Sequence, residues 1–95
     1  MLGRLEILVV NDLGCEDVVS VTFRRDTVEV WADGRSRGVF EREELRAWLA
    51  EPAGSIRTDD VGLSVLPARV ALDVGDMVSS WALAPGVLRD LRTRV

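Results

Sequence analysis

Histidine, lysine and tyrosine are absent from this chain of 95 residues, which contains a single cysteine. The missing side chains remove the usual general base, the amine that forms Schiff bases and the phenol from the possible catalytic groups. One cysteine excludes an internal disulfide and a cysteine-rich zinc site, and the lack of histidine removes the commonest zinc ligand. We therefore expect a protein that is not an enzyme and that uses no cofactor and no metal.

Long apolar runs are also missing. No stretch approaches the roughly 20 residues that span a bilayer, and the segment MLGRLEILVV lacks the basic flank and the cleavage site of a secretory signal. At 95 residues, of which 47% are apolar, the chain is long enough for one modest core and too short for two independent domains. We expect a single domain, residues 1–95, in the cytoplasm and without membrane contact.

Positive charge is carried by arginine alone. All 12 basic residues are Arg, a bias typical of a high-GC genome, and the net charge is −4. An acidic domain repels phosphate backbones unless its arginines gather on one face. Nucleic acid is therefore an unlikely partner, and no motif indicates a small-molecule ligand.

Two stretches alternate apolar and polar residues in the manner of half-buried strands. They are VVSVTFRR, residues 18–25, and TVEVWAD, residues 27–33. A two-residue turn at Arg25 and Asp26 places Phe23 opposite Val28 and brings the other alternating apolar residues to the same face. The alternation therefore predicts both the hairpin and its register.

The dipeptide Asp33-Gly34 predicts a second turn, for which two lengths are possible. A two-residue turn sets Arg37 beside Val30 on the core face, and a charged side chain resists such a position. A three-residue loop, Ala32–Gly34, keeps Arg37 on the outer face. We therefore favour the longer loop.

The longer loop gives the outer face of this sheet the composition of a binding surface. It pairs Trp31 with Arg35 and Glu29 with Arg37, and Arg24 lies on the same face. Trp and Arg are favoured at the centres of protein interfaces, and the same surface could stack a base or bind an anion. A helix of the same chain that covers Trp31 is the structural alternative. The candidate binding residues are Trp31, Arg24, Arg35 and Arg37.

The remainder of the chain repeats this order of elements. EREELRAWLAEP has apolar residues at helical spacing and predicts a helix from about Glu41 to Ala50. Residues 56–58 are a possible brief strand. VGLSVL, ARVALDV and MVSSWALA predict three more strands, and Pro85 opens a second helix. Trp48 and Trp81 lie on patterns that indicate the core.

A constant spacing relates the two halves: Phe40, Leu45 and Trp48 fall on Leu83, Leu88 and Leu91. Either an internal duplication or a chance similarity of pattern explains this match. In both cases the sequence predicts an α+β, antiparallel β-rich domain. It would consist of two β-β-β-α units with two short helices, preceded by an extra strand, Leu5–Val10.

The polar stretch NDLGCED, Asn11–Asp17, could be a site or a turn. Asn, Asp and Gly suit a chain reversal between strands. The acidic neighbours of Cys15 disfavour its thiolate, and the stretch lacks the ligand spacing of an EF-hand loop. We interpret it as a turn.

The run VEVWADGRSRGVFEREELRAWLAEP, Val28–Pro52, combines a strand that contains Trp, a Gly turn and a helix that ends in Trp-Leu before Pro. It resembles a pattern of small uncharacterised proteins of high-GC Gram-positive bacteria. The resemblance implies no known activity and favours a protein that stands alone.

From the whole sequence we expect a non-enzymatic protein-interaction module that binds a partner protein or, as a homodimer, itself. The first alternative is an Arg- and Trp-mediated binder of nucleic acid or anions. The second is a carboxylate-dependent enzyme, which would need a pocket joining Asp59, Asp60 and Asp73.

Overall fold

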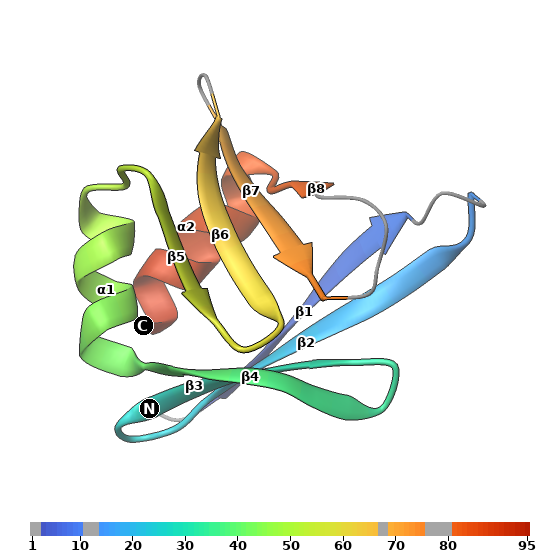
Figure 1. The fold of residues 1–95 in the computed structure, drawn as a ribbon, viewed down its shortest axis with the longest axis horizontal. Coiled ribbons are helices and arrows are strands. Elements are labelled where there is room, and N and C mark those ends of the chain that lie inside the picture. The colour runs from blue at the N-terminus through green and yellow to red at the C-terminus, as the bar shows by residue number, and fades with distance from the viewer. Residues whose placement is uncertain (1–2, 11–13, 67–68, 76–80) are drawn as a thin grey trace.

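The computed structural model describes residues 3–10, 14–66, 69–75 and 81–95, and they form two antiparallel sheets, each followed by a helix (Figure 1). Sheet 1 contains β1 (Gly3–Val10), β2 (Glu16–Phe23), β3 (Thr27–Ala32) and β4 (Arg35–Glu41), and α1 (Arg42–Ala50) follows it. Sheet 2 contains β5 (Ser55–Thr58), β6 (Val61–Leu66), β7 (Arg69–Val74) and β8 (Trp81–Ala82), and α2 (Pro85–Arg94) follows it. In both sheets the strands are neighbours in chain order.

The predicted α+β class is confirmed, but the repeated unit is larger than predicted. Each half has four strands before its helix, because β1 pairs with β2 and β5 pairs with β6. The expected extra strand is therefore the first strand of sheet 1. The strand predicted from MVSSWALA is described only at Trp81–Ala82, since residues 76–80 lie outside the described part of the chain.

The register predicted for the first hairpin is confirmed. Phe23 lies opposite Val28 and Val21 lies opposite Val30. The backbone N–H of Arg24 donates to the carbonyl of Thr27 at 2.8 Å and closes the turn. The alternating apolar residues thus reach one face together, as the spacing required.

The prediction of a three-residue loop between β3 and β4 was wrong. The connection is a two-residue turn in which Asp33 and Gly34 both have positive φ, 54° and 73°. Trp31 pairs with Ser36, and a bulge then shifts the register so that Arg37 is the extra residue. Trp31 and Glu29, which were expected opposite Arg35 and Arg37, therefore lie opposite other residues of β4.

One hydrophobic core lies between the two sheets and the helices. The inner faces of both sheets contribute valines and leucines, and Phe23 and Phe40 are the buried aromatic residues of the described core. Leu45 and Leu49 of α1 and Leu91 of α2 close it. The predicted core residues Trp48 and Trp81 are only partly buried, against its margin.

The two sheets join where β4 meets the end of β5. The N–H of Asp60 and the hydroxyl of Thr58 donate to the carbonyls of Arg37 and Val39, both at 3.0 Å. A Cβ at Gly38 would lie only 2.7 Å from the Thr58 carbonyl oxygen. Glycine is therefore required for this close approach.

Arginines of each helix cap the C-terminal end of the other. Arg42 donates to the carbonyl of Arg94 at 2.8 Å, and Arg42 and Arg46 both donate to the backbone oxygen of Val95. In return, Arg92 donates to the carbonyl of Leu49 at 2.9 Å. Cations suit the negative end of a helix and satisfy its last carbonyls. None of the described helices is long and apolar enough to cross a membrane.

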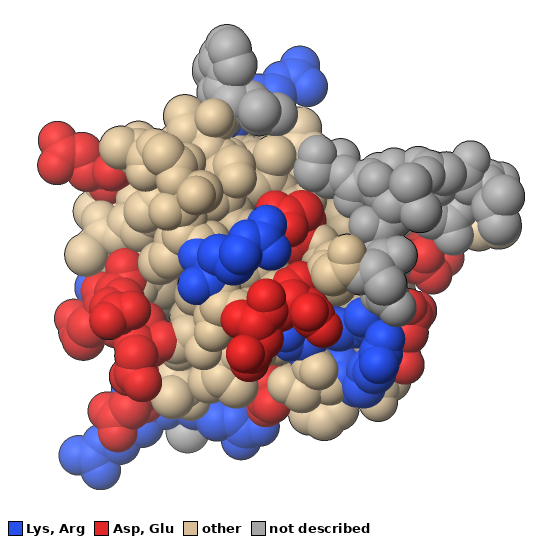
Figure 2. All heavy atoms as spheres, viewed as in Figure 1, with Lys and Arg blue, Asp and Glu red and all other residues tan. Residues whose placement is uncertain are grey.

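Acidic and basic side chains are interspersed on the face of the molecule seen in Figure 2. In sheet 2, Arg57 pairs with Asp73, and both side chains lie over Gly62. Together with the arginines that donate to the helix ends, this pair shows that several arginines make contacts within the fold.

Glu16 and Asp17, the last two residues of the stretch interpreted as a turn, begin β2 and pair with Val10 and Val9, so the turn interpretation is wrong for these two residues. Gly14 has a φ of 78°, as a chain reversal allows, and Cys15 is exposed. The turn interpretation for residues 11–13 lies outside the described residues.

Candidate protein-interaction face

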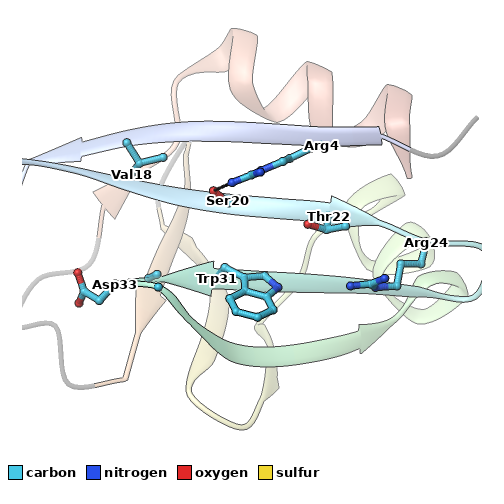
Figure 3. A pocket seen from close by; sticks show the side chains of 9 residues that line it. Arg4, Val18, Ser20, Thr22, Arg24, Trp31 and Asp33 are labelled. Carbon is cyan, nitrogen blue, oxygen red and sulfur yellow. Dashed lines mark hydrogen bonds between the residues drawn. The ribbon is translucent and has the colours of Figure 1, made fainter.

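The outer face of sheet 1 is not covered by any described helix or strand. Figure 3 looks onto this face, with sheet 2 and both helices behind it. Along each strand the inward side chains enter the core, while the alternate side chains point to solvent. Trp31 is 37% exposed, so the structural alternative in which a helix covers it is wrong.

Five apolar side chains form a diagonal stripe across the four strands of this face. Leu8 on β1 lies directly opposite Val18 on β2. Trp31 on β3 and then Val39 on β4 each lie one outer position further along the sheet, diagonally from the preceding residue. All five are exposed, and together they are called the outer stripe: Leu8, Val10, Val18, Trp31 and Val39. Single exposed apolar side chains are normal on a protein surface, whereas several on one face indicate an interaction site.

A groove of about 380 Å³ overlaps the stripe, since Val18 and Trp31 both line it. Trp31 and Arg24 line one side of it, and Arg4 lies on the other (Figure 3). The guanidinium of Arg4, on β1, reaches the neighbouring strand β2 and donates to the hydroxyl of Ser20 at 3.1 Å. The groove therefore has an apolar wall formed by an indole and a floor of small hydroxyl side chains, Ser20 and Thr22.

Glu29 organises the part of the face next to Trp31. Its carboxylate accepts hydrogen bonds from Ser36 at 2.7 Å and from Arg24 at 2.8 Å. The hydrogen bond from Ser36, followed by that from Arg24, holds the pKa of Glu29 below its ordinary value. This network fixes the position of the Arg24 guanidinium on the face that also carries Trp31.

The candidate residues from the sequence do not all gather on this face. Trp31 and Arg24 line the groove, whereas Arg35 and Arg37 do not. Arg37 is only 3% exposed, and it donates to the carbonyl of Ala32 and to the carboxylate of Asp33, both at 3.1 Å. The turn itself supplies the partners that make a buried guanidinium tolerable.

The sequence interpretation missed most of the outer stripe. Leu8, Val10, Val18 and Val39 were not among its candidate residues, and Arg4 was not either. The available signal was the segment LEILVV, which is apolar on both faces of a strand in a sheet that has one wet face.

Carboxylates proposed for the alternative enzyme occupy structural positions. Asp59 and Asp60 form the turn between β5 and β6, and Asp73 pairs with Arg57. Within the described ranges, no group of three or more His, Cys, Asp or Glu side chains could hold a metal ion.

No family model, no curated protein and no solved structure matches this chain. The resemblance of Val28–Pro52 to small proteins of high-GC Gram-positive bacteria therefore stays a prediction.

Proposed function

We propose that this protein is a non-enzymatic protein-interaction module and that the outer face of sheet 1 is its binding surface. The partner is another protein or a second copy of the chain. The outer stripe carries this proposal, because it exposes five apolar side chains that the core of the fold does not use.

The composition of the face supports a protein partner. An exposed indole in the middle of the sheet, with aliphatic side chains on either side, is typical of the centre of a protein interface. The hydroxyl side chains and the two guanidinium groups that line the groove offer polar contacts next to the apolar side chains. Binding of a partner would remove these apolar side chains from water, which favours the complex.

The arrangement of the arginines favours protein over nucleic acid. Arg42, Arg46 and Arg92 donate to helix ends, and Arg57 pairs with Asp73. Beside Trp31, Arg24 is bound to Glu29, so an acidic group accompanies the base-stacking residue. A phosphate backbone is attracted by unopposed positive charge, which this pair does not provide.

A capture experiment with matched variants tests the proposal. Wild type, Trp31→Ala and Val65→Ala would be immobilised separately and exposed to extract of the native host, with and without nuclease. Val65 on β6 is the control, because it is an exposed apolar residue outside the stripe. We expect proteins that wild type and Val65→Ala retain and that Trp31→Ala loses.

Two results would contradict the proposal. Equal capture by Trp31→Ala and wild type would show that the face does not bind the partner. Capture that disappears on nuclease treatment and falls steeply with salt would instead assign the face to nucleic acid.

A further inference from the structure

The outer positions of sheet 1 carry more negative than positive charge. With Arg24, which lies on the same face just after β2, they hold two arginines and four glutamates: Arg4, Glu6, Glu16, Arg24, Glu29 and Glu41. Each arginine lies close to one glutamate of the face, Arg24 to Glu29 at 2.8 Å and Arg4 to Glu6 at 3.8 Å. The excess negative charge of the face is therefore carried by the other two glutamates.

These two glutamates lie at opposite ends of the outer stripe. Glu16 lies directly opposite Val10 and is two positions from Val18 on β2. Glu41 is two positions from Val39 on β4. Both are exposed, and neither forms an ion pair with any residue that the structure describes. The stripe is therefore apolar along its length and has an exposed carboxylate beside each end.

The length of the stripe fits three to four turns of a helix. From Leu8 to Val39 it crosses three strand spacings of about 4.8 Å and advances along the strands by four residues of about 3.4 Å each. The diagonal is on the order of 20 Å, which a helix of about 13 residues spans. An amphipathic helix presents a continuous apolar stripe of this kind, whereas an extended segment turns alternate side chains away from the sheet.

From the apolar stripe, its length and the carboxylates at both ends, we infer that the partner of this face is a cationic amphipathic helix of another protein. Its apolar side would cover the outer stripe, and lysine or arginine side chains towards its two ends would meet Glu16 and Glu41. Complementary charge favours this partner over an acidic one, and over a second copy of the chain, whose face carries the same excess of negative charge. The inference rests on the proposed function, since it names the class of partner for the same surface.

Binding of two designed peptides tests the inference. Both are fluorescein-labelled, about 14 residues long, and have leucines at helical spacing; the remaining positions are lysine in one peptide and glutamate in the other. Fluorescence anisotropy at low salt measures the affinity of each peptide for wild type, Trp31→Ala and two double variants. The double variant of the face is Glu16→Gln with Glu41→Gln. Its matched control is Glu44→Gln with Glu51→Gln, which removes two exposed carboxylates of α1 and the residue after it, behind sheet 1.

We expect wild type to bind the lysine peptide and not the glutamate peptide. The double variant of the face should bind the lysine peptide about fivefold or more weakly, whereas the matched control should change the affinity by less than about twofold. Trp31→Ala should weaken binding by about tenfold, because the indole lies in the middle of the stripe. Added salt should reduce the difference between wild type and the double variant of the face, since ions screen exposed charges. Circular dichroism of each variant establishes that it is folded.

The possible failures are distinguishable. Equal affinity of wild type for the two peptides, no binding of the lysine peptide, or equal losses in the two double variants would each overturn the cationic helix as partner. Sedimentation equilibrium of the protein alone adds a further check, because a dimer that Trp31→Ala abolishes would assign the face to a second copy. Capture of host proteins that depends on Trp31 would still support the proposed function in all of these cases.

Discussion

The two sheets differ most in what their outer faces expose. Sheet 1 exposes the outer stripe to solvent, whereas the outer positions of sheet 2 include Gly62 and Ser64, and the Arg57–Asp73 pair lies over Gly62. Their inner faces are alike, since both supply valine and leucine to one core. The comparison shows that this fold can be built without an apolar outer face. Folding alone therefore does not explain the stripe.

The helices of the two halves differ in a related way. α1 begins at Arg42 and α2 at Pro85, so the matched residues of the sequence take the same positions from the start of each helix. However, Leu45 is only 2% exposed, while its counterpart Leu88 is partly buried at the margin of the core. The similarity of position does not extend to equal burial.

Replacing Leu45 and Leu88 by alanine compares these two positions with the largest effect that we expect. Leu45→Ala should lower the free energy of unfolding by about 3 kcal/mol, and Leu88→Ala by about 1 to 2 kcal/mol, because less of its side chain is buried. Urea unfolding of both variants measures the difference. Equal losses would indicate that the helices are equivalent in packing and would strengthen the case for a duplication.

Two glycines compare the junction between the sheets with the outer face of sheet 2. Gly38→Ala should cost about 2 kcal/mol, since the new Cβ would meet a backbone carbonyl at 2.7 Å. At Gly62 the neighbours are the ends of the Arg57 and Asp73 side chains, at 2.6 and 2.8 Å, which can move. Gly62→Ala should therefore cost less than about 1 kcal/mol, which is the worth of a surface ion pair. Urea unfolding of both variants measures the two losses. A larger loss for Gly62→Ala than for Gly38→Ala would show that the sheet junction adapts to the new Cβ.

Removing the indole of Trp31 tests whether the stripe is independent of folding. At concentrations where wild type is monomeric, Trp31→Ala should change the free energy of unfolding by less than about 1 kcal/mol, because the side chain already contacts water. Thermal unfolding followed by circular dichroism gives this value. A strongly lowered midpoint would show that Trp31 belongs to the core of sheet 1 after all.

The smallest expected effect concerns the pH dependence of the network at Glu29. Its folded-state pKa is lowered, so its contribution to stability is present above the unfolded-state pKa of about 4.3 and is lost as the pH falls through the folded-state value. Glu29→Gln should therefore differ from wild type at neutral pH and approach it in acid. Stability curves of both proteins between neutral and acidic pH measure this change.

Ser36→Ala sharpens the same test. It removes the hydrogen bond that lowers the pKa of Glu29 most, so the pKa should rise toward its ordinary value. NMR titration of the Glu29 side chain reports the shift directly. An unchanged pKa would show that Arg24 alone holds the carboxylate in its charged form.

Elements with clear alternation could be predicted from the sequence, and those whose residues find unusual partners could not. Phe23 and Val28 fixed the first hairpin, because a slip by one residue would expose every apolar side chain. The register predicted for the second hairpin, between β3 and β4, depended on the position of Arg37. Charged side chains avoid cores on average, but here Ala32 and Asp33 supply hydrogen bonds that only the folded turn creates.

The candidate binding face shows the same limit of local information. Trp31 and Arg24 could be assigned to the outer face, because their strands alternate apolar with polar residues. Leu8 and Val10 share their face of β1 with Arg4 and Glu6, so the alternation along β1 indicated an outward position for them as well. The alternation could not indicate that no described helix or strand covers this face, because that depends on the position of sheet 2 and both helices behind sheet 1 (Figure 3).

The order of the strands has a consequence for folding kinetics. Every strand pairs with its neighbour in the chain, so each sheet can form by successive short loop closures. The contacts that close the molecule, such as Arg94 to Arg4 and Arg92 to Leu49, join residues far apart in sequence. We therefore expect each meander to form early and the docking of the two halves to determine the folding rate, which should exceed that of sandwiches with crossed connections.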